Sequence, residues 1–155
     1  MPNRREMLKR STTLASLMIA AGLLPAVARA QAAPYPSAAF ELNNMAALMK
    51  ALGAAAPAES PDIMLQVPEI AENGAVVPIA ASTTLPGLKR LLVLVEKNPN
   101  LMAAMFEMSD AIEPAIATRV KMGQSSKVFA VAMLNDGRVL YAQKEVKVTL
   151  GGCGG

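Results

Sequence analysis

The sequence contains no histidine and no tryptophan, and its single cysteine is Cys153. Without histidine, neither a Ser-His-Asp nor a Cys-His catalytic arrangement can form, and a zinc or iron site built from histidine and cysteine is excluded as well. A single cysteine also excludes a disulfide bond within the chain. Any reactivity must therefore come from carboxylates, hydroxyls, lysines or the Cys153 thiol.

The excess of basic residues is confined to the first 30 residues, and the rest of the chain is nearly neutral. Those residues contain five basic side chains and one acidic side chain, whereas the remaining 125 contain ten basic and eleven acidic ones. The sequence pI of about 9.2 thus comes from the N-terminal segment. Aromatic residues make up 3% of the chain, and no basic run follows residue 30, so nucleic acid is not an expected partner.

Residues 1–30 have the features of an export signal. A basic start precedes the apolar run 14–28, which is shorter than the roughly 20 residues that a membrane span requires. The run ends at Ala28-Arg29-Ala30, a small-x-small site that predicts cleavage between Ala30 and Gln31. We therefore expect no attachment to a membrane after signal cleavage.

The basic start has a more specific pattern. Asn3-Arg4-Arg5-Glu6-Met7-Leu8-Lys9 resembles the twin-arginine export motif, although Asn3 and Met7 stand where Ser or Thr and Phe are usual. Twin-arginine export carries folded proteins, sometimes with a partner bound. The pattern predicts a bacterial periplasmic protein.

Residues 31–150 are expected to form one domain that begins with a helix. Over residues 41–55, apolar side chains recur at three- to four-residue spacing and share one face: Leu42, Met45, Leu48, Met49 and Leu52. Gly53 and Pro57 are expected to end this helix. Its apolar face must pack on the domain itself or on a partner.

From Asp62 onward, short apolar runs are separated by turn residues, which is typical of strands. The clearest pattern is a hairpin in which Asn135-Asp136-Gly137 joins strands 128–134 and 139–150. On the second strand, Val146, Val148 and Leu150 should face the core. The spacing of six or seven such runs predicts an all-β fold, an immunoglobulin-like antiparallel β-sandwich with a short N-terminal helix.

The chain then continues as Gly-Gly-Cys-Gly-Gly over residues 151–155. Glycine has broad access to backbone conformations, so this segment is expected to be a flexible C-terminal arm. At about 3.3–3.6 Å per extended residue, Cys153 reaches roughly 10 Å beyond Leu150. The nearest basic residue in sequence is Lys147, too far along the chain to make the thiol a strong nucleophile by itself. The pattern indicates a carrier whose sulfur is activated by another protein.

Other candidate sites are weaker. Lys144 with Glu145, or Asp110 with Glu113, are more typical of solvated faces than of acid-base pairs. A clustering of methionines is suggestive of Cu(I), but side-chain packing is the better interpretation of Met102, Met105 and Met108. We expect no metal and no cofactor.

The end of the chain resembles a known family. Val146-Lys147-Val148-Thr149-Leu150-Gly151-Gly152-Cys153-Gly154-Gly155 is similar to the C-terminal signature of SoxY, the sulfur carrier of the bacterial Sox thiosulfate-oxidation system. Three internal segments also resemble that family: residues 71–78, residues 97–99 and residues 119–122. With the leader, the resemblance covers nearly the whole chain.

The resemblance implies a function without turnover by the chain itself. Cys153 would hold the sulfur intermediates, and Gly151, Gly152, Gly154 and Gly155 would form the carrier arm. SoxZ would be the heterodimer partner. The implied enzyme partners are a haem c thiosulfate-conjugating enzyme, a manganese-dependent hydrolase that releases sulfate and, where present, a sulfane dehydrogenase.

Two alternatives stay open from the residues alone. The first is a structural sandwich that dimerises through an intermolecular Cys153 disulfide. The second is a thiol-dependent redox enzyme, which a resolving cysteine or a nearby base would favour, and the sequence contains neither.

Overall fold

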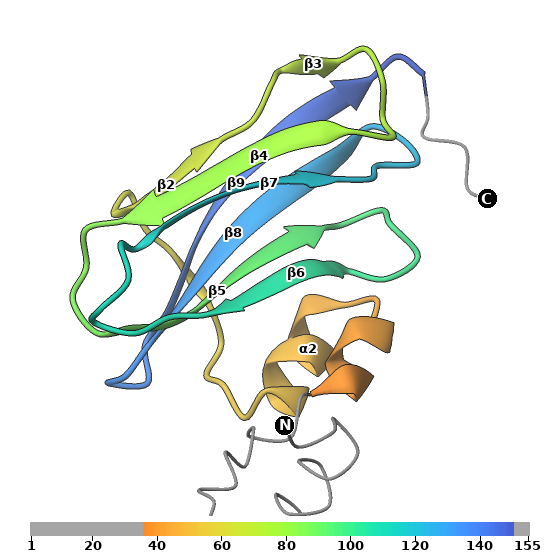
Figure 1. The fold of residues 1–155 in the computed structure, drawn as a ribbon. Coiled ribbons are helices and arrows are strands. Elements are labelled where there is room, and N and C mark those ends of the chain that lie inside the picture. Colours follow the sequence, from red (N-terminus) through yellow and green to blue (C-terminus); the bar gives the residue numbers. More distant parts are fainter. Residues whose placement is uncertain (1–35, 151–155) are drawn as a thin grey trace, which may run out of the picture. The chain divides into compact units, whose positions relative to one another are not determined.

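The computed structural model describes residues 36–150 (Figure 1). The predicted export signal, the cleavage site and the arm at residues 151–155 lie outside the described residues and stay predictions. Residues 36–150 form two short helices followed by the predicted all-β sandwich.

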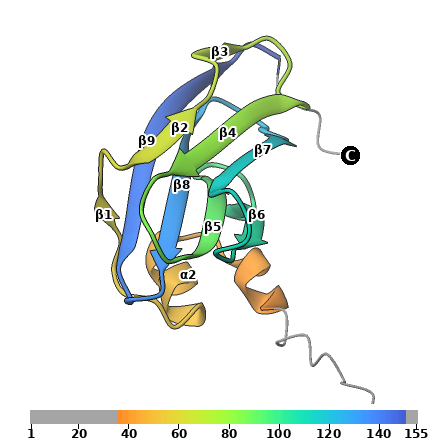
Figure 2. The ribbon, with the colours of Figure 1, turned by 60° about the vertical axis from the view of Figure 1, so that its left-hand side comes forward.

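Two sheets make up the sandwich (Figures 1 and 2). The small sheet has the order β2 (Ile63–Gln66), β4 (Val77–Thr83), β7 (Ala115–Val120). The large sheet has the order β1 (Ala58–Glu59), β9 (Val139–Val148), β8 (Ser126–Leu134), β5 (Leu88–Val95), β6 (Met102–Glu107), and β3 (Ile70–Ala71) also pairs with β9. The long strands pair antiparallel, as predicted, whereas the two-residue strands β1 and β3 run parallel to β9.

The predicted hairpin is present. Strands β8 and β9 pair from Met133 opposite Val139 onward, and the turn between them has Gly137 at φ +90°, a backbone conformation that favours glycine. The Leu134 carbonyl accepts a hydrogen bond from the Gly137 N–H at 3.1 Å, and the Arg138 carbonyl accepts one from the Leu134 N–H at 2.9 Å. The turn residues therefore set the register of the longest strand pair.

The helical segment differs from the single helix predicted over residues 41–55. It consists of the 3-10 helix η1 (Ser37–Glu41) and the α-helix α2 (Met45–Ala51), separated by the extended residue Leu42. The break occurs because Asn44 caps α2, with its side chain accepting a hydrogen bond from the Ala47 N–H at 2.8 Å. Helical periodicity detects the shared apolar face but not such a cap.

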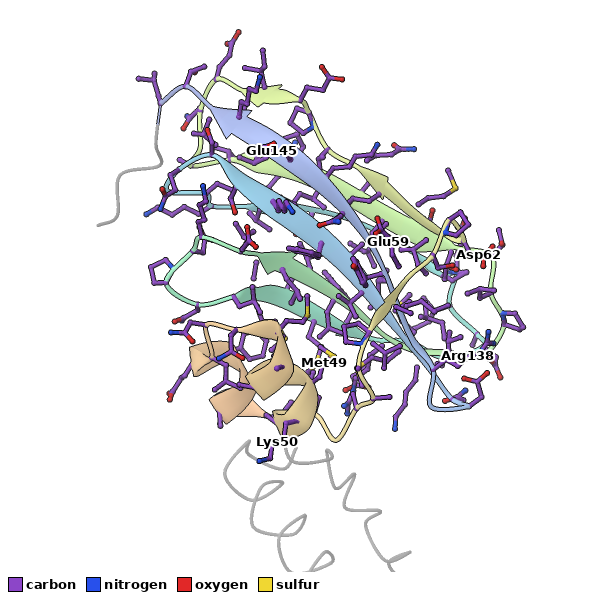
Figure 3. The ribbon with its side chains drawn as sticks, turned by 180° about the vertical axis from the view of Figure 1, so that it is seen from behind. Met49, Lys50, Glu59, Asp62, Arg138 and Glu145 are labelled. Carbon is purple, nitrogen blue, oxygen red and sulfur yellow. The ribbon has the colours of Figure 1, made fainter. Side chains whose placement is uncertain are left out.

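The apolar face of the helices packs on the domain's own large sheet. Leu48 and Met49 are buried there in a cluster with residues of four strands, among them Leu92, Leu94 and Val131. Figure 3 shows Met49 between α2 and the sheet, and Lys50 on the side of α2 away from it. The sequence left open whether this face packs on the domain itself or on a partner, and the structure shows that it packs on the domain itself.

The continuous apolar run in β5 follows from burial on both faces of the sheet. Leu91, Val93 and Val95 face the core between the two sheets, while Leu92 and Leu94 face the helices. A strand covered on both sides reads as an unbroken hydrophobic stretch rather than an alternating one. The large sheet is thus the middle layer of the domain.

Leu150 departs from the predicted facing of the last strand. Val146 is fully buried and Val148 packs on the core, as predicted, but β9 ends at Val148 and the Leu150 side chain is 70% exposed. The prediction for Leu150 was wrong because the inter-sheet core ends before this residue.

Replacing Leu48 by alanine tests the docking of α2. Leu48 is completely buried, so Leu48→Ala is expected to lower the free energy of unfolding by about 2–5 kcal/mol. Thermal or denaturant unfolding measures the loss. The exposed residue Ile112 supplies the control, since Ile112→Ala should change stability by no more than about 0.5 kcal/mol. Equal midpoints for the two variants would contradict the packing described.

Candidate functional site at the root of the arm

The residues just before the arm are held by β3 on one side. Along the parallel pairing of β3 with β9, the Lys147 N–H donates to the Glu69 carbonyl at 2.9 Å, and the Thr149 N–H donates to the Ala71 carbonyl at 3.1 Å. The Thr149 hydroxyl adds a bond to the Glu72 carbonyl at 3.1 Å. Strand pairing therefore continues past the last residue of β9.

Further bonds hold the same residues from other segments. The Val148 N–H donates to the Ser125 hydroxyl at 2.9 Å. The Leu150 carbonyl accepts a hydrogen bond from the Gly74 N–H at 2.8 Å. Residues 147–150 each make at least one of these bonds, so the backbone is fixed up to the residue that precedes the predicted arm.

Three loops meet around this point, and we call this region the arm end: residues 72–76, 96–101 and 121–125, with Thr149 and Leu150. The Gly74 carbonyl accepts from the Met122 N–H at 2.7 Å, which links the first loop to the third. The Asn98 side chain donates to the Lys121 carbonyl at 2.7 Å, which links the second to the third. Figure 1 shows these loops on the side where the chain leaves β9.

Two adjacent serines complete the arm end. Besides the bond from Ser125 to β9, the buried Ser126 hydroxyl accepts from the Lys97 N–H at 3.0 Å and donates to the Lys127 carbonyl at 3.0 Å. Neither serine was singled out from the sequence. Their position at the start of a strand, with Ser125 just before β8 and Ser126 as its first residue, is the only sequence signal for this role.

The arm end overlaps with all three internal segments in which the sequence resembles SoxY. Residues 71–78, 97–99 and 119–122 all contribute to the hydrogen bonds just described. The structure therefore brings together segments that are about 20 residues or more apart in the sequence. Cys153 and the four glycines around it lie outside the described residues.

The weaker candidate residues are either exposed on the surface or packed in the hydrophobic clusters. Asp110, Glu113, Lys144 and Glu145 are exposed, as expected of solvated faces. Met102 and Met105 pack beside the helices and Met108 packs on the inter-sheet core, so these methionines serve in packing, as expected. Among residues 36–150, no group of three or more Asp, Glu, His or Cys residues is arranged to hold a metal ion.

The opposite end of β9 has its own charged group. The Asp136 carboxylate accepts hydrogen bonds from the backbone N–H of Arg138 at 2.9 Å and from its guanidinium at 2.7 Å, and these hold the pKa of that carboxyl below its usual value. Arg138 and Glu145 are labelled near opposite ends of β9 in Figure 3. This ion pair is therefore remote from the arm end.

The outer face of the small sheet has a shallow hollow. It is lined by side chains of all three strands and the residues after β2, among them Gln66, Pro78, Ala80, Ala117 and Arg119. Of the residues that the structure describes, none that lines the hollow carries a carboxylate or a thiol. The hollow therefore lacks the paired groups that acid-base or nucleophilic catalysis requires.

A family model described as "Sulfur oxidation protein SoxY" matches residues 48–153, well over half of the chain. The chain belongs to the SoxY family. The sulfur carrier protein SoxY from Chlorobium limicola f thiosulfatophilum is 31% identical to it, with a TM-score of 0.60 over 68% of this chain and 94% of that one. The matched residues include all three loops of the arm end.

More distant structures share the fold alone. Two variants of the superoxide reductase neelaredoxin from Ignicoccus hospitalis match with TM-scores of 0.50. They are 18% and 19% identical, and they cover 56% and 64% of this chain and 78% and 86% of their own. No curated protein sequence matches the chain.

Membership of the SoxY family makes the chain a sulfur carrier rather than an enzyme, as the sequence predicted. It also places the chain in the Sox system, with SoxZ as the usual partner of this family. No helix within residues 36–150 has both the length and the hydropathy of a membrane span.

Removing the Ser125 hydroxyl tests the anchoring of the arm root. Ser125→Ala deprives the Val148 N–H of its acceptor, so stability should fall by about 1 kcal/mol and amide exchange at residues 148–150 should accelerate. Hydrogen-deuterium exchange of peptides from this region measures the effect. Ser109→Ala, at an exposed position in the loop between β6 and β7, is the control. Unchanged exchange in Ser125→Ala would show that this bond does not hold the arm root.

Proposed function

We propose that the chain carries sulfur covalently on the Cys153 thiol in the periplasm, as a heterodimer with SoxZ. The observation that best supports this is the hydrogen bonding of β9 through Leu150, directly before the segment that contains the only thiol. A carrier needs a fixed attachment for its arm and a slender arm beyond it. The first requirement is met by described residues, and the second is expected from the four glycines.

The geometry of the attachment limits the reach of the carrier. Cys153 is three residues beyond Leu150, so its Cα lies within roughly 10 Å of the Leu150 Cα. Glycines on both sides of the thiol add no side-chain width, which suits entry into a narrow cleft. The enzymes would supply the catalytic groups, and no metal-binding cluster accompanies the arm root among the described residues.

The first half of the proposed cycle loads sulfur and releases one sulfate. A haem c enzyme would join thiosulfate to the thiol: a sulfur–sulfur bond forms, the thiol proton leaves, and two electrons pass to the haem c enzyme. The product is Cys153–S–S–SO₃⁻. A manganese-dependent hydrolase would then add water to the terminal sulfur, which releases sulfate and two protons and leaves a persulfide on Cys153.

The second half restores the carrier. Where a sulfane dehydrogenase is present, it would oxidise the outer sulfur of the persulfide with three water molecules, which releases six electrons and six protons and gives Cys153–S–SO₃⁻. A second hydrolysis would release sulfate and return the free thiol. All intermediates stay attached to Cys153, so one arm must visit each enzyme in turn.

The proposed location rests on the leader. The twin-arginine-like motif and the cleavage site between Ala30 and Gln31 support export to the periplasm. Because that export route carries folded proteins, SoxZ would be exported together with this chain. The mature protein would then have no attachment to the membrane.

Replacing Cys153 by serine tests covalent carriage. The SoxYZ heterodimer with Cys153→Ser, incubated with thiosulfate and the haem c enzyme, should gain no mass, whereas the parent should gain the mass of a thiosulfonate adduct. Intact-protein mass spectrometry measures the adduct. Melting temperature and SoxZ binding should be unchanged, since the hydrogen bonds that hold residues 147–150 do not involve the Cys153 side chain.

Two results would contradict this proposal. An adduct on Cys153→Ser would place the sulfur elsewhere on the complex. A parent protein that forms only Cys153–Cys153 dimers while thiosulfate is consumed would favour the structural alternative, in which the thiol joins two copies of the chain.

Side-chain size at position 152 tests the need for a slender arm. Loading should slow progressively from the parent to Gly152→Ala and then to Gly152→Leu, with a loss of roughly tenfold or more for leucine, because the added atoms must enter the enzyme cleft beside the thiol. Stopped-time mass spectrometry gives the rates. Equal rates for alanine and leucine would mean that the clefts do not restrict the arm at this position.

A further inference from the structure

Asn73 and Gly74 form a dipeptide that can react with itself. Asn73 is the only asparagine of the chain that a glycine follows. In such a pair, the backbone nitrogen of the glycine can attack the side-chain amide carbon of the asparagine, because glycine has no Cβ to obstruct the approach. The attack ends in loss of ammonia and conversion of the asparagine to an acid. The conformation of the two residues determines how readily this reaction proceeds.

The turn around Asn73 holds the electrophilic carbon in place. The Asn73 Oδ1 accepts a hydrogen bond from the Ala75 N–H at 2.9 Å, and the Asn73 backbone carbonyl accepts one from the Val76 N–H at 3.3 Å. The first bond closes an Asx turn, a ring that contains both the Asn73 Cγ and the Gly74 nitrogen. It also draws electron density away from Cγ, which makes that carbon a better electrophile. Asn73 is exposed, so water can reach its side chain.

The Gly74 nitrogen, by contrast, is restrained. Gly74 is buried, its N–H donates to the Leu150 carbonyl at 2.8 Å, and its carbonyl accepts from the Met122 N–H at 2.7 Å. The attack requires the nitrogen to lose its proton and to turn toward Cγ. Both changes break the bond to Leu150. The nitrogen can therefore react only in molecules in which this bond has opened.

We propose that Asn73 is a site of spontaneous deamidation, and that the hydrogen bond from the Gly74 N–H to the Leu150 carbonyl controls its rate. This inference is independent of the chemistry at Cys153. The reaction proceeds when the start of the arm separates from residues 72–76, at a rate set by the population of that open state. Asn73 thus records how often the arm root opens over the lifetime of the protein.

The reaction balances without an oxidant or a reductant. A bond forms between the Gly74 nitrogen and the Asn73 Cγ, the bond from Cγ to Nδ2 breaks, and ammonia leaves with the proton from Gly74. Water then opens the resulting succinimide ring at either carbonyl. One opening gives aspartate. The other gives isoaspartate, in which the backbone runs through the side chain and is longer by one methylene group.

Isoaspartate at this position loosens the arm root. The added methylene lies directly before Gly74, whose N–H and carbonyl bind two different segments through Leu150 and Met122. The extra length displaces Gly74 from these partners. Aspartate keeps the backbone length and adds only a negative charge beside Glu72, so it disturbs the root less.

The test follows the SoxYZ heterodimer in mildly alkaline buffer. Mass spectrometry of the peptide that contains residue 73 measures the conversion of amide to acid, and electron-transfer fragmentation separates aspartate from isoaspartate. Thr149→Val removes the bond from the Thr149 hydroxyl to the Glu72 carbonyl, which ties the residue before Asn73 to the arm root. Conversion should then be faster by about fivefold, the factor that corresponds to one typical net hydrogen bond.

The matched control is Thr84→Val, the same change at an exposed position just after β4, at the opposite end of that strand from Gly74. Its conversion rate should equal that of the parent. The parent in denaturant gives the rate without restraint, and the native parent should convert more slowly than that. Asn73→Ser keeps an acceptor for the Ala75 N–H but has no amide, so amide exchange at residues 147–150 should accelerate with age in the parent and not in this variant.

Three results would overturn the proposal. A native protein that stays unconverted while the denatured chain converts completely would show that the site does not react in the folded state. Equal rates for the native and the denatured parent would show that the bond to Leu150 gives no protection. Equal rates for Thr149→Val and Thr84→Val would separate the reaction from the arm root.

Discussion

The backbone is hydrogen-bonded as far as the Leu150 carbonyl, and Cys153 follows three residues later in the sequence. This attachment limits how far the proposed carrier thiol can lie from the domain. If pairing ended earlier on β9, the thiol would sweep a larger volume and could meet an enzyme far from the domain surface. With Leu150 held by Gly74, the thiol remains within roughly 10 Å of the arm end. Docking and chemistry are therefore coupled by chain length alone: an enzyme that reaches the thiol also contacts the surface beside it.

The rest of the fold makes this attachment rigid. The central strands β5 and β8 are covered on one face by the small sheet and on part of the other by the helices, so they are buried on both sides. β9 pairs with β8 from Val139 to Val146 and is held by β1 and β3 on its other side. The loops of the arm end are in turn connected by hydrogen bonds of Gly74, Asn98 and Ser126. A sulfur carrier with no catalytic groups of its own thus depends on positioning.

Much of this was predictable from the sequence, for physical reasons that differ by element. The hairpin followed from its turn residues, and the strand β5 followed from an unbroken apolar run. The meeting of the three loops could also be predicted, because every second connection between successive antiparallel strands lies at the same end of a sandwich. The two-residue parallel strands and the Ser125 and Ser126 bonds depend on tertiary contacts that no local pattern encodes. The Asn44 cap is a local signal, but the periodicity of the apolar residues does not detect it. Leu150 was assigned to the core by alternation, which does not show where a core ends.

Mass spectrometry of the protein from its own compartment tests the central claim most directly. The chain is purified without reductant from the periplasm of cells that are consuming thiosulfate, and the peptide containing Cys153 is analysed. Covalent carriage predicts sulfane, thiosulfonate or polysulfane adducts on Cys153 that a thiol reductant removes, on a chain that begins at Gln31. A bare thiol, or only a Cys153–Cys153 dimer, under these conditions would contradict the account.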